Sequence, residues 1–190
     1  MRGGIEYMDI TLNQRVEPDE FSDKLAKLVP AGVRVFGVKE VPLKTPSLMS
    51  TVAGMDYVII VDGPPEDWEP AIAGLLVRDV IEVSRRTKRK KRRRGPPTRM
   101  VDIRPNIISI TVQAAGEEQS IIRVALQTVE RRGAKIREVL EVMGADFSKA
   151  QTVRVNTRFT EEMGLGDMAQ GKGESFASAL PPAANQQGIG

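Results

Sequence analysis

Residues 107–126, IISITVQAAGEEQSIIRVAL, contain the pattern that decides the fold. Two runs, Ile107–Ala114 and Gln119–Leu126, are rich in β-branched residues, and Ala115-Gly116-Glu117-Glu118 separates them. Such residues favour strands, and a short polar connection containing glycine favours a tight reversal of the chain. We therefore expect an antiparallel hairpin of two strands at these positions.

The segments around this hairpin predict further strands and helices. Alternation of apolar and polar residues predicts strands, and apolar residues at a spacing of three or four predict helices. The expected strands are Glu6–Leu12, Val33–Val41, Tyr57–Val61, Val80–Val83, Arg99–Ile103 and Thr152–Arg158. One helix is expected from Pro18, and a short one from a Ser47 cap to near Gly54. A third is expected near Trp68, with Ile72, Leu75 and Leu76 on its apolar side, and a fourth from near Ile136 to Gly144.

This order of elements predicts an α+β protein. We expect two sheet-and-helix halves, residues 1–84 and 99–160, each similar to a ferredoxin-like split β-α-β unit. A basic loop, residues 85–98, joins the halves or decorates a hairpin between them. The tail, residues 161–190, is dominated by Gly, Ala, Gln, Ser and Pro, and we expect it to be disordered.

The basic loop holds most of the unbalanced positive charge. Nine of the ten residues in RRTKRKKRRR, 85–94, are Lys or Arg, and without them the chain has 19 basic and 25 acidic side chains, a formal charge of 19 − 25 = −6. Such a block repels itself and is expected on a solvated loop, where a polyanion is its natural counter-charge. The candidate nucleic-acid contacts are Arg85, Arg86, Lys88, Arg89, Lys90, Lys91, Arg92, Arg93 and Arg94.

Two interpretations of this basic run remain open. In the first, its cations bind RNA phosphates and release counterions, which makes the affinity strongly dependent on salt. In the second, it is a solvated loop with only adventitious affinity. No aromatic residue interrupts the run, so it lacks stacking groups, and binding independent of base sequence is favoured.

The composition argues against autonomous catalysis. The chain has no His and no Cys, which removes the commonest general base and metal ligand as well as any disulfide, thiol nucleophile or cluster-binding thiolate. We therefore expect no metal and no cofactor in this chain. No stretch has the length and apolarity of a secretion signal or a membrane span, so we expect a cytoplasmic protein without membrane contact.

Asp102 and Arg104 are weak catalytic candidates. They flank Ile103 in an expected strand, which would place both side chains on one face until Pro105 ends the strand. Arg104 could clamp an oxyanion or carboxylate while Asp102 positions it. Alternatively, the two residues form a structural pair at the end of a strand.

Lys44, Thr45 and Ser47 are candidates for contact with a ligand or a partner protein. They lie in a segment bounded by Pro42 and Pro46, and loops carry function disproportionately. The competing interpretation is structural, because the prolines break regular structure and Ser47 can cap a helix.

Three ordered segments carry a resemblance to a known family: EYMDITL at 6–12, VFGVKEVPLKTPSLMSTVAGMDYVI at 35–59 and VDIRPNI at 101–107. Together, over roughly residues 5–158, the chain resembles the radical-SAM-linked domain of unknown function, which is fused to, or encoded beside, radical SAM proteins carrying a B12-binding domain. Members of that family usually begin with some tens of residues that have no counterpart here. A misassigned start, a fragment and a genuine short form are the alternatives for this missing N-terminal segment.

The resemblance implies an accessory domain, non-catalytic alone, that docks with a radical SAM partner. Any iron–sulfur cluster, SAM or cobalamin would then belong to that partner, because this chain supplies no thiolates. RNA binding through the arginine-rich loop fits this role. The alternatives are an RNA-modifying or RNA-processing enzyme, or a fragment of one, that uses Asp102 as a base and Arg104 to stabilise negative charge, and a truncated chain with only structural interactions.

Overall fold

The structure is a computed structural model that describes residues 2–86, 98–129 and 132–160. Its helices and strands confirm the expected α+β class. The chain contacts divide it into two compact units, which are described separately. Among the described residues, unit 1 contains 2–6, 52–86, 98–129 and 132–158, and unit 2 contains 7–51 and 159–160.

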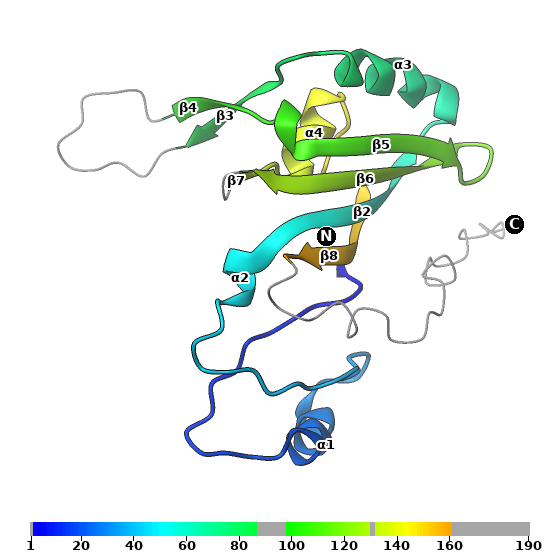
Figure 1. Cartoon of the computed structure of the whole chain (residues 1–190). Helices are drawn as coiled ribbons and strands as arrows, with labels where there is room; N and C mark the ends of the chain where they lie inside the picture. Colours follow the sequence, from blue (N-terminus) through cyan, green and yellow to red (C-terminus); the bar gives the residue numbers. More distant parts are fainter. Residues whose placement is uncertain (1, 87–97, 130–131, 161–190) are drawn as a thin grey trace, which may run out of the picture. The chain divides into compact units, whose positions relative to one another are not determined.

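A six-stranded sheet forms the centre of unit 1 (Figure 1). Its strand order is β1-β8-β2-β6-β5, and β7 also pairs with β6. β6 pairs antiparallel with β2, β5 and β7, and β1 pairs parallel with β8. The strands are β1 (Arg2–Gly3), β2 (Val52–Asp62), β5 (Ile107–Ala114), β6 (Gln119–Val129), β7 (Arg132–Gly133) and β8 (Gln151–Phe159).

The hairpin expected at 107–126 is confirmed as β5 and β6. Ala114 pairs with Ser120, and the Ala115 N–H donates to the Gln119 carbonyl at 2.8 Å, which closes the connection. On its other side, β6 pairs with β2 from Asp62↔Gln119 to Gly54↔Gln127. The central sheet therefore combines strands that precede and follow the basic run.

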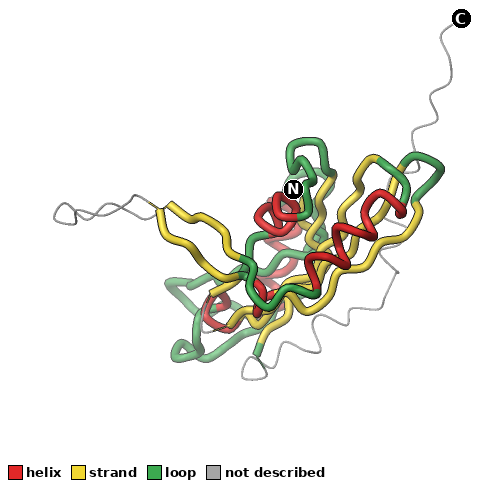
Figure 2. Tube along the Cα trace, turned by 90° about the horizontal axis from the view of Figure 1, so that it is seen from above, coloured by secondary structure: helices red, strands yellow, loops and turns green. Residues whose placement is uncertain are grey.

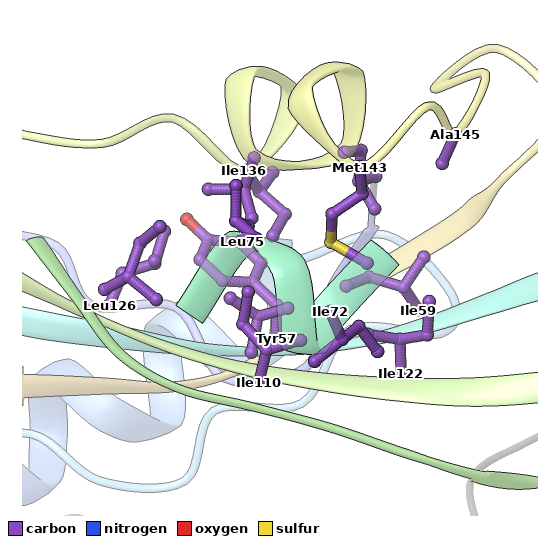
Figure 3. Packing of buried hydrophobic residues seen from close by; sticks show 14 of the residues in the cluster. Tyr57, Ile59, Ile72, Leu75, Ile110, Ile122, Leu126, Ile136, Met143 and Ala145 are labelled. Atoms are coloured by element: carbon purple, nitrogen blue, oxygen red, sulfur yellow. The ribbon is translucent and has the colours of Figure 1, made fainter. Parts of the chain in front are cut away.

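Two helices cover one face of this sheet: α3 (Pro65–Leu76) and α4 (Ile136–Val142). Both were expected from their apolar spacing, and α4 is followed by Gly144 at φ 84°, a backbone conformation that suits glycine. Their apolar side chains meet those of β2, β5 and β6 in an aliphatic core (Figure 3). Its fully buried members include Ile59, Leu75, Ile122, Val124, Val139 and Leu140.

A second, two-stranded sheet carries the start of the basic run. β3 (Glu82–Arg86) pairs antiparallel with β4 (Thr98–Asp102), and the two strands project away from the central sheet (Figure 2). Buried Ile81 and Ile103 anchor its base, where the Ile103 N–H donates to the Ile81 carbonyl at 2.8 Å. The strand expected at 80–83 thus begins later, and regular structure extends through Arg86. A 3₁₀ turn, η1 (Arg104–Asn106), then leads into β5.

Unit 2 holds α1 (Pro18–Leu28) and the short α2 (Leu48–Thr51). The helix expected from Pro18 is confirmed, with acidic Asp19 and Glu20 in its first turn.

The strands expected at 6–12 and 33–41 are wrong, because the structure forms no strand at either place. Both segments have the alternating pattern, but a strand also needs a neighbouring backbone to pair with, and none pairs with them in the described part of the chain. Apolar side chains of both segments, such as Met8 and Phe36, are exposed.

Candidate nucleic-acid interface

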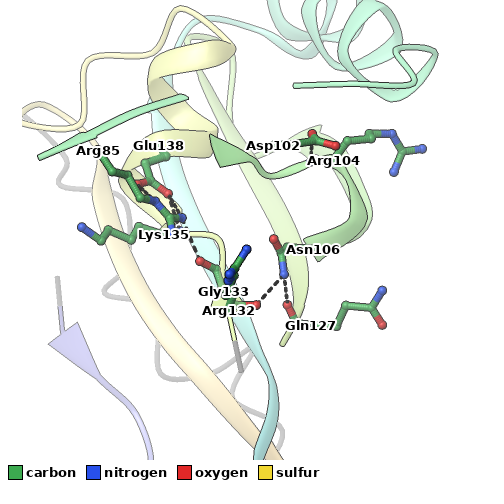
Figure 4. A network of polar contacts seen from close by, with 9 residues as sticks. All are labelled: Arg85, Asp102, Arg104, Asn106, Gln127, Arg132, Gly133, Lys135 and Glu138. Atoms are coloured by element: carbon green, nitrogen blue, oxygen red, sulfur yellow. Dashed lines mark hydrogen bonds and ion pairs between the residues drawn. The ribbon is translucent and has the colours of Figure 1, made fainter. Parts of the chain in front are cut away.

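Arg85, the first residue of the basic run, is tied to the core of unit 1. Its Nε and Nη2 atoms donate to the two carboxylate oxygens of Glu138 at 2.8 and 2.7 Å, and Nη2 also donates to the Gly133 carbonyl at 2.8 Å (Figure 4). The Arg85 and Glu138 side chains are only 15% and 11% exposed. Arg85 therefore lies in β3, although it was expected in a loop, and it is bound within the protein instead of standing free in solvent.

Glu138 fixes the start of α4 as well as the β3–β4 hairpin. One carboxylate oxygen accepts the Lys135 N–H at 2.9 Å. This is one half of a capping box, in which the side chain of the third helical residue, Glu138, bonds to the backbone N–H of the residue before the helix. Burial by itself raises the pKa of Glu138, but the bonds from Arg85 and the Lys135 amide, with the charges of Arg85 and Lys135, bring the pKa below its ordinary value. Glu138 is thus held as the anion that neutralises Arg85.

Asn106 connects η1 to the other side of the same network. Its side-chain amide donates to the carbonyls of Gln127 at 3.0 Å and Arg132 at 2.8 Å, and Asn106 is buried (Figure 4). The Gln127 amide in turn donates to the Pro105 carbonyl at 2.7 Å. These bonds hold the backbone of β7 in place beside β6.

The Asp102 side chain accepts hydrogen bonds from the backbone. One of its carboxylate oxygens accepts the N–H groups of Ile81 and Arg104, each at 2.9 Å. β4 ends at Asp102, and Arg104 begins η1, so the prediction that the two residues share one strand and one face is wrong. The turn begins before Pro105, because Asp102 itself accepts the amide that would otherwise continue the ladder.

Arg104 binds carbonyl groups. Its guanidinium donates to the carbonyls of Leu76 at 3.1 Å and Arg78 at 3.0 Å, at the end of α3, and to that of Ile107 at 3.3 Å. These contacts join the end of α3 to the start of β5 and satisfy carbonyls that a helix end leaves without partners. The geometry supports a structural role for Asp102 and Arg104.

The remaining cations of the run divide between described and undescribed residues. Arg86 is exposed at the end of β3. The other seven, Lys88, Arg89, Lys90, Lys91, Arg92, Arg93 and Arg94, and the tail expected to be disordered, lie outside the described residues.

Lys44, Thr45 and Ser47 lie in the segment before α2, in unit 2. The Thr45 N–H donates to the Pro42 carbonyl at 2.9 Å, which makes a turn, and the Lys44 side chain is exposed. The Asp9 carboxylate accepts the Leu48 N–H at 2.8 Å. Asp9 thus supplies a side-chain acceptor for the first residue of α2, where the sequence suggested a cap by Ser47.

Two cavities in the described residues are too small for a typical small-molecule site. One, of about 180 Å³, lies beside Arg137, Glu141 and Phe147, and the other, of about 70 Å³, lies beside Met55, Tyr57 and Leu126. Both are smaller than the roughly 300 Å³ at which ligand pockets begin, and neither is lined by Asp102. The described residues also contain no group of three acidic side chains placed to hold a metal ion.

Sequence reasoning missed Glu138 and Asn106, the two buried polar residues that organise this region. A local signal existed for Glu138, which stands three positions after Lys135 at the start of a predicted helix, where a capping carboxylate is common. No local signal marked its pairing with Arg85, 53 positions away.

These features define an α+β protein with a helix-covered sheet and a projecting hairpin that carries a basic segment. The chain belongs to the family of uncharacterized proteins conserved in bacteria, DUF2344, whose model matches residues 1–137. No curated protein and no solved structure matches the chain. Within the described residues, every helix is too short or too polar to cross a membrane.

Proposed function

We propose that this protein is an accessory RNA-binding protein, non-catalytic alone, that docks with a radical SAM enzyme in the cytoplasm. The observation that carries the RNA-binding part is the placement of the basic run between β3 and β4. Arg86 pairs with Thr98 across the hairpin, so the cations at 88–94 belong to the connection between two paired strands.

The anchoring of Arg85 supports this proposal. The contacts of Arg85 with Glu138 and Gly133 join β3 to the helix and the short strand beside it. The strand that leads into the connection is therefore fixed to unit 1. Contacts to phosphates depend on charge and not on base identity, which fits a run without aromatic residues.

The radical SAM partner is proposed from the resemblance in three sequence segments, two of which overlap unit 2. Unit 2 has features of a docking region. α1 buries none of its residues, and large apolar side chains are exposed, with Leu43 at 95% and Leu28 at 81%. An apolar surface of this kind on a partner-binding protein is buried when the partner binds. In this proposal the iron–sulfur cluster, SAM and cobalamin all belong to the partner.

Replacing residues 88–94 by a Gly/Ser segment of equal length tests RNA binding. Fluorescence anisotropy with a labelled single-stranded RNA should show a steep salt dependence for the unaltered chain, with a log–log slope of about −0.7 per phosphate contact. The Gly/Ser variant should lose most of the affinity. The matched control permutes the Lys and Arg residues of 88–94, which keeps the charge and should keep the affinity.

An unchanged salt slope in the Gly/Ser variant would show that the basic run is not the binding site. Co-purification tests the docking separately: the tagged chain should capture a radical SAM protein, and iron and visible absorbance should accompany the partner and be absent from the chain alone.

The alternative function, an RNA-modifying or RNA-processing enzyme using Asp102 and Arg104, has less support. The Asp102 carboxylate is occupied by two backbone N–H groups, and the Arg104 guanidinium by three carbonyls. Neither group lines either of the two cavities described above.

A further inference from the structure

A second group of cations, all in described residues, surrounds the contacts that Arg85 makes. Arg99 lies on β4, Arg132 on β7 and Lys135 directly before α4, and all three are exposed. We refer to these three residues as the Arg85 surface.

The contacts of Arg85 bring the three cations to one side of unit 1. Arg99 is the direct cross-strand partner of Arg85, so both side chains leave the hairpin on the same face. Arg85 donates to the Gly133 carbonyl, next to Arg132, and Glu138 accepts the Lys135 N–H. Figure 4 shows Arg132 and Lys135 close to the Arg85–Glu138 pair. Arg99 is therefore paired with Arg85 across the strands, Arg132 is next to a residue that Arg85 contacts, and Lys135 is hydrogen-bonded to Glu138.

The charges of this surface are only partly compensated. Like charges directly opposite each other on paired strands are unfavourable, and Arg85 is neutralised by Glu138, whereas Arg99 is not. Within the described ranges, no carboxylate lies within ion-pair distance of Arg99 or Arg132. An anion bound here would supply the missing counter-charge without displacing a protein contact.

We propose that Arg99, Arg132 and Lys135 form a fixed phosphate-binding surface for the RNA backbone, beside the basic run. This inference rests on the proposed RNA binding and specifies a second contact area for the same ligand. Because the three residues sit on two strands and at a helix start held by Arg85, Glu138 and Asn106, they present phosphate contacts at fixed spacing.

The test compares two triple variants of the full chain in anisotropy titrations with single-stranded RNA from 50 to 300 mM salt. Arg99→Gln/Arg132→Gln/Lys135→Gln removes the three cations of the Arg85 surface. The control, Arg123→Gln/Lys149→Gln/Lys27→Gln, removes three exposed cations elsewhere and changes the net charge equally. We expect the first variant to reduce the magnitude of the log–log salt slope by about 2, three contacts at roughly 0.7 each, and the control to leave it unchanged.

Arg99→Gln alone is the second variant and guards against loss of folding in the triple variant. It removes a like-charge pair, so its melting temperature should be equal to or above that of the unaltered chain, while its slope falls by roughly 0.7. If the unaltered chain binds and the Gly/Ser replacement of 88–94 weakens it, but both surface variants keep the full slope, this inference is overturned and the proposed function stands. If the unaltered chain binds no RNA, both are overturned.

Discussion

Arg85 donates two hydrogen bonds to the Glu138 carboxylate, at 2.8 and 2.7 Å, and so joins the hairpin to a helix 53 positions later in the chain. Because both side chains are largely buried, removing one partner leaves the other charge without compensation. We expect Glu138→Gln to lower the free energy of unfolding by about 3 kcal/mol. Urea denaturation followed by far-UV circular dichroism measures this loss.

The double variant Arg85→Met/Glu138→Leu is the matched control for that experiment. Replacement of a buried ion pair by apolar side chains of similar volume is often close to neutral, so the double variant should be more stable than Glu138→Gln. Equal stability of Glu138→Gln and the unaltered chain would mean that the pair does not hold the hairpin.

The lowered pKa of Glu138 predicts a loss of stability in acid. Since this pKa is lower in the folded state than in the unfolded state, the stabilisation is fully present above the unfolded value and is lost as pH falls through the folded value. Melting temperatures measured from pH 7 down to pH 3 should fall less steeply for Glu138→Gln than for the unaltered chain. Parallel curves would show that Glu138 does not contribute to the acid sensitivity.

Gly54 allows the Arg158 side chain to cross β2. A Cβ at position 54 would lie 2.5 Å from both the Arg158 Nη2 atom and the Leu126 carbonyl oxygen, and these two atoms form a hydrogen bond of 2.8 Å. We expect Gly54→Ala to destabilise the protein by about 1–3 kcal/mol, because Arg158 must move and Leu126 loses its donor.

Gly74, in the last turn of α3, is the control for Gly54, because a Cβ there meets no atom within 4 Å. Gly74→Ala should raise stability by about 0.5–1 kcal/mol through its higher helix propensity. Thermal melts of both variants provide the comparison, and a Gly54→Ala variant as stable as the unaltered chain would contradict the packing described.

The contacts of Asp102 predict that removing its side chain lowers stability and leaves RNA affinity unchanged, which a catalytic role would not predict. Asp102→Ala leaves the Ile81 and Arg104 N–H groups without their acceptor and should cost about 1–3 kcal/mol of stability. At temperatures where the variant is folded, its RNA affinity should match that of the unaltered chain. A variant of full stability that had lost an RNA-dependent activity would favour the catalytic alternative.

The exposed apolar residues of unit 2 predict a separation of docking from folding. Leu43 is 95% exposed, so Leu43→Ser should leave the melting temperature within about 1 °C of the original. It should nevertheless weaken capture of the radical SAM partner in a pull-down. Gln113→Ser, on an exposed strand position of unit 1, is the control and should capture normally. Equal capture by both variants would place docking elsewhere.

Elements with a strong local pattern could be predicted from the sequence. The β5–β6 hairpin, α1, α3 and α4 each combine apolar spacing with clear start and stop residues. The incorrect predictions depend on contacts between residues that are far apart in the sequence. Residues 6–12 and 33–41 alternate as strands do, yet no described strand pairs with them, and the pairing of β2 with β6 depends on tertiary packing.

The candidate site shows the same division. The charge density of the basic run can be read from the sequence. The ion pair of Arg85 with Glu138 cannot, because a charge count does not show which cation lies beside a buried carboxylate. Likewise, the D-I-R spacing of Asp102 and Arg104 favours a strand, whereas capture of the Arg104 amide by Asp102 produces a turn.

The pairing of Arg86 with Thr98 makes the hairpin a natural insertion point. Arg86 and Thr98 are neighbours, and lengthening a loop between fixed ends costs only about 0.6 kcal/mol for each doubling. A foreign peptide grafted between Arg86 and Thr98 should therefore leave the rest of unit 1 folded, which makes this chain a scaffold for displaying peptides.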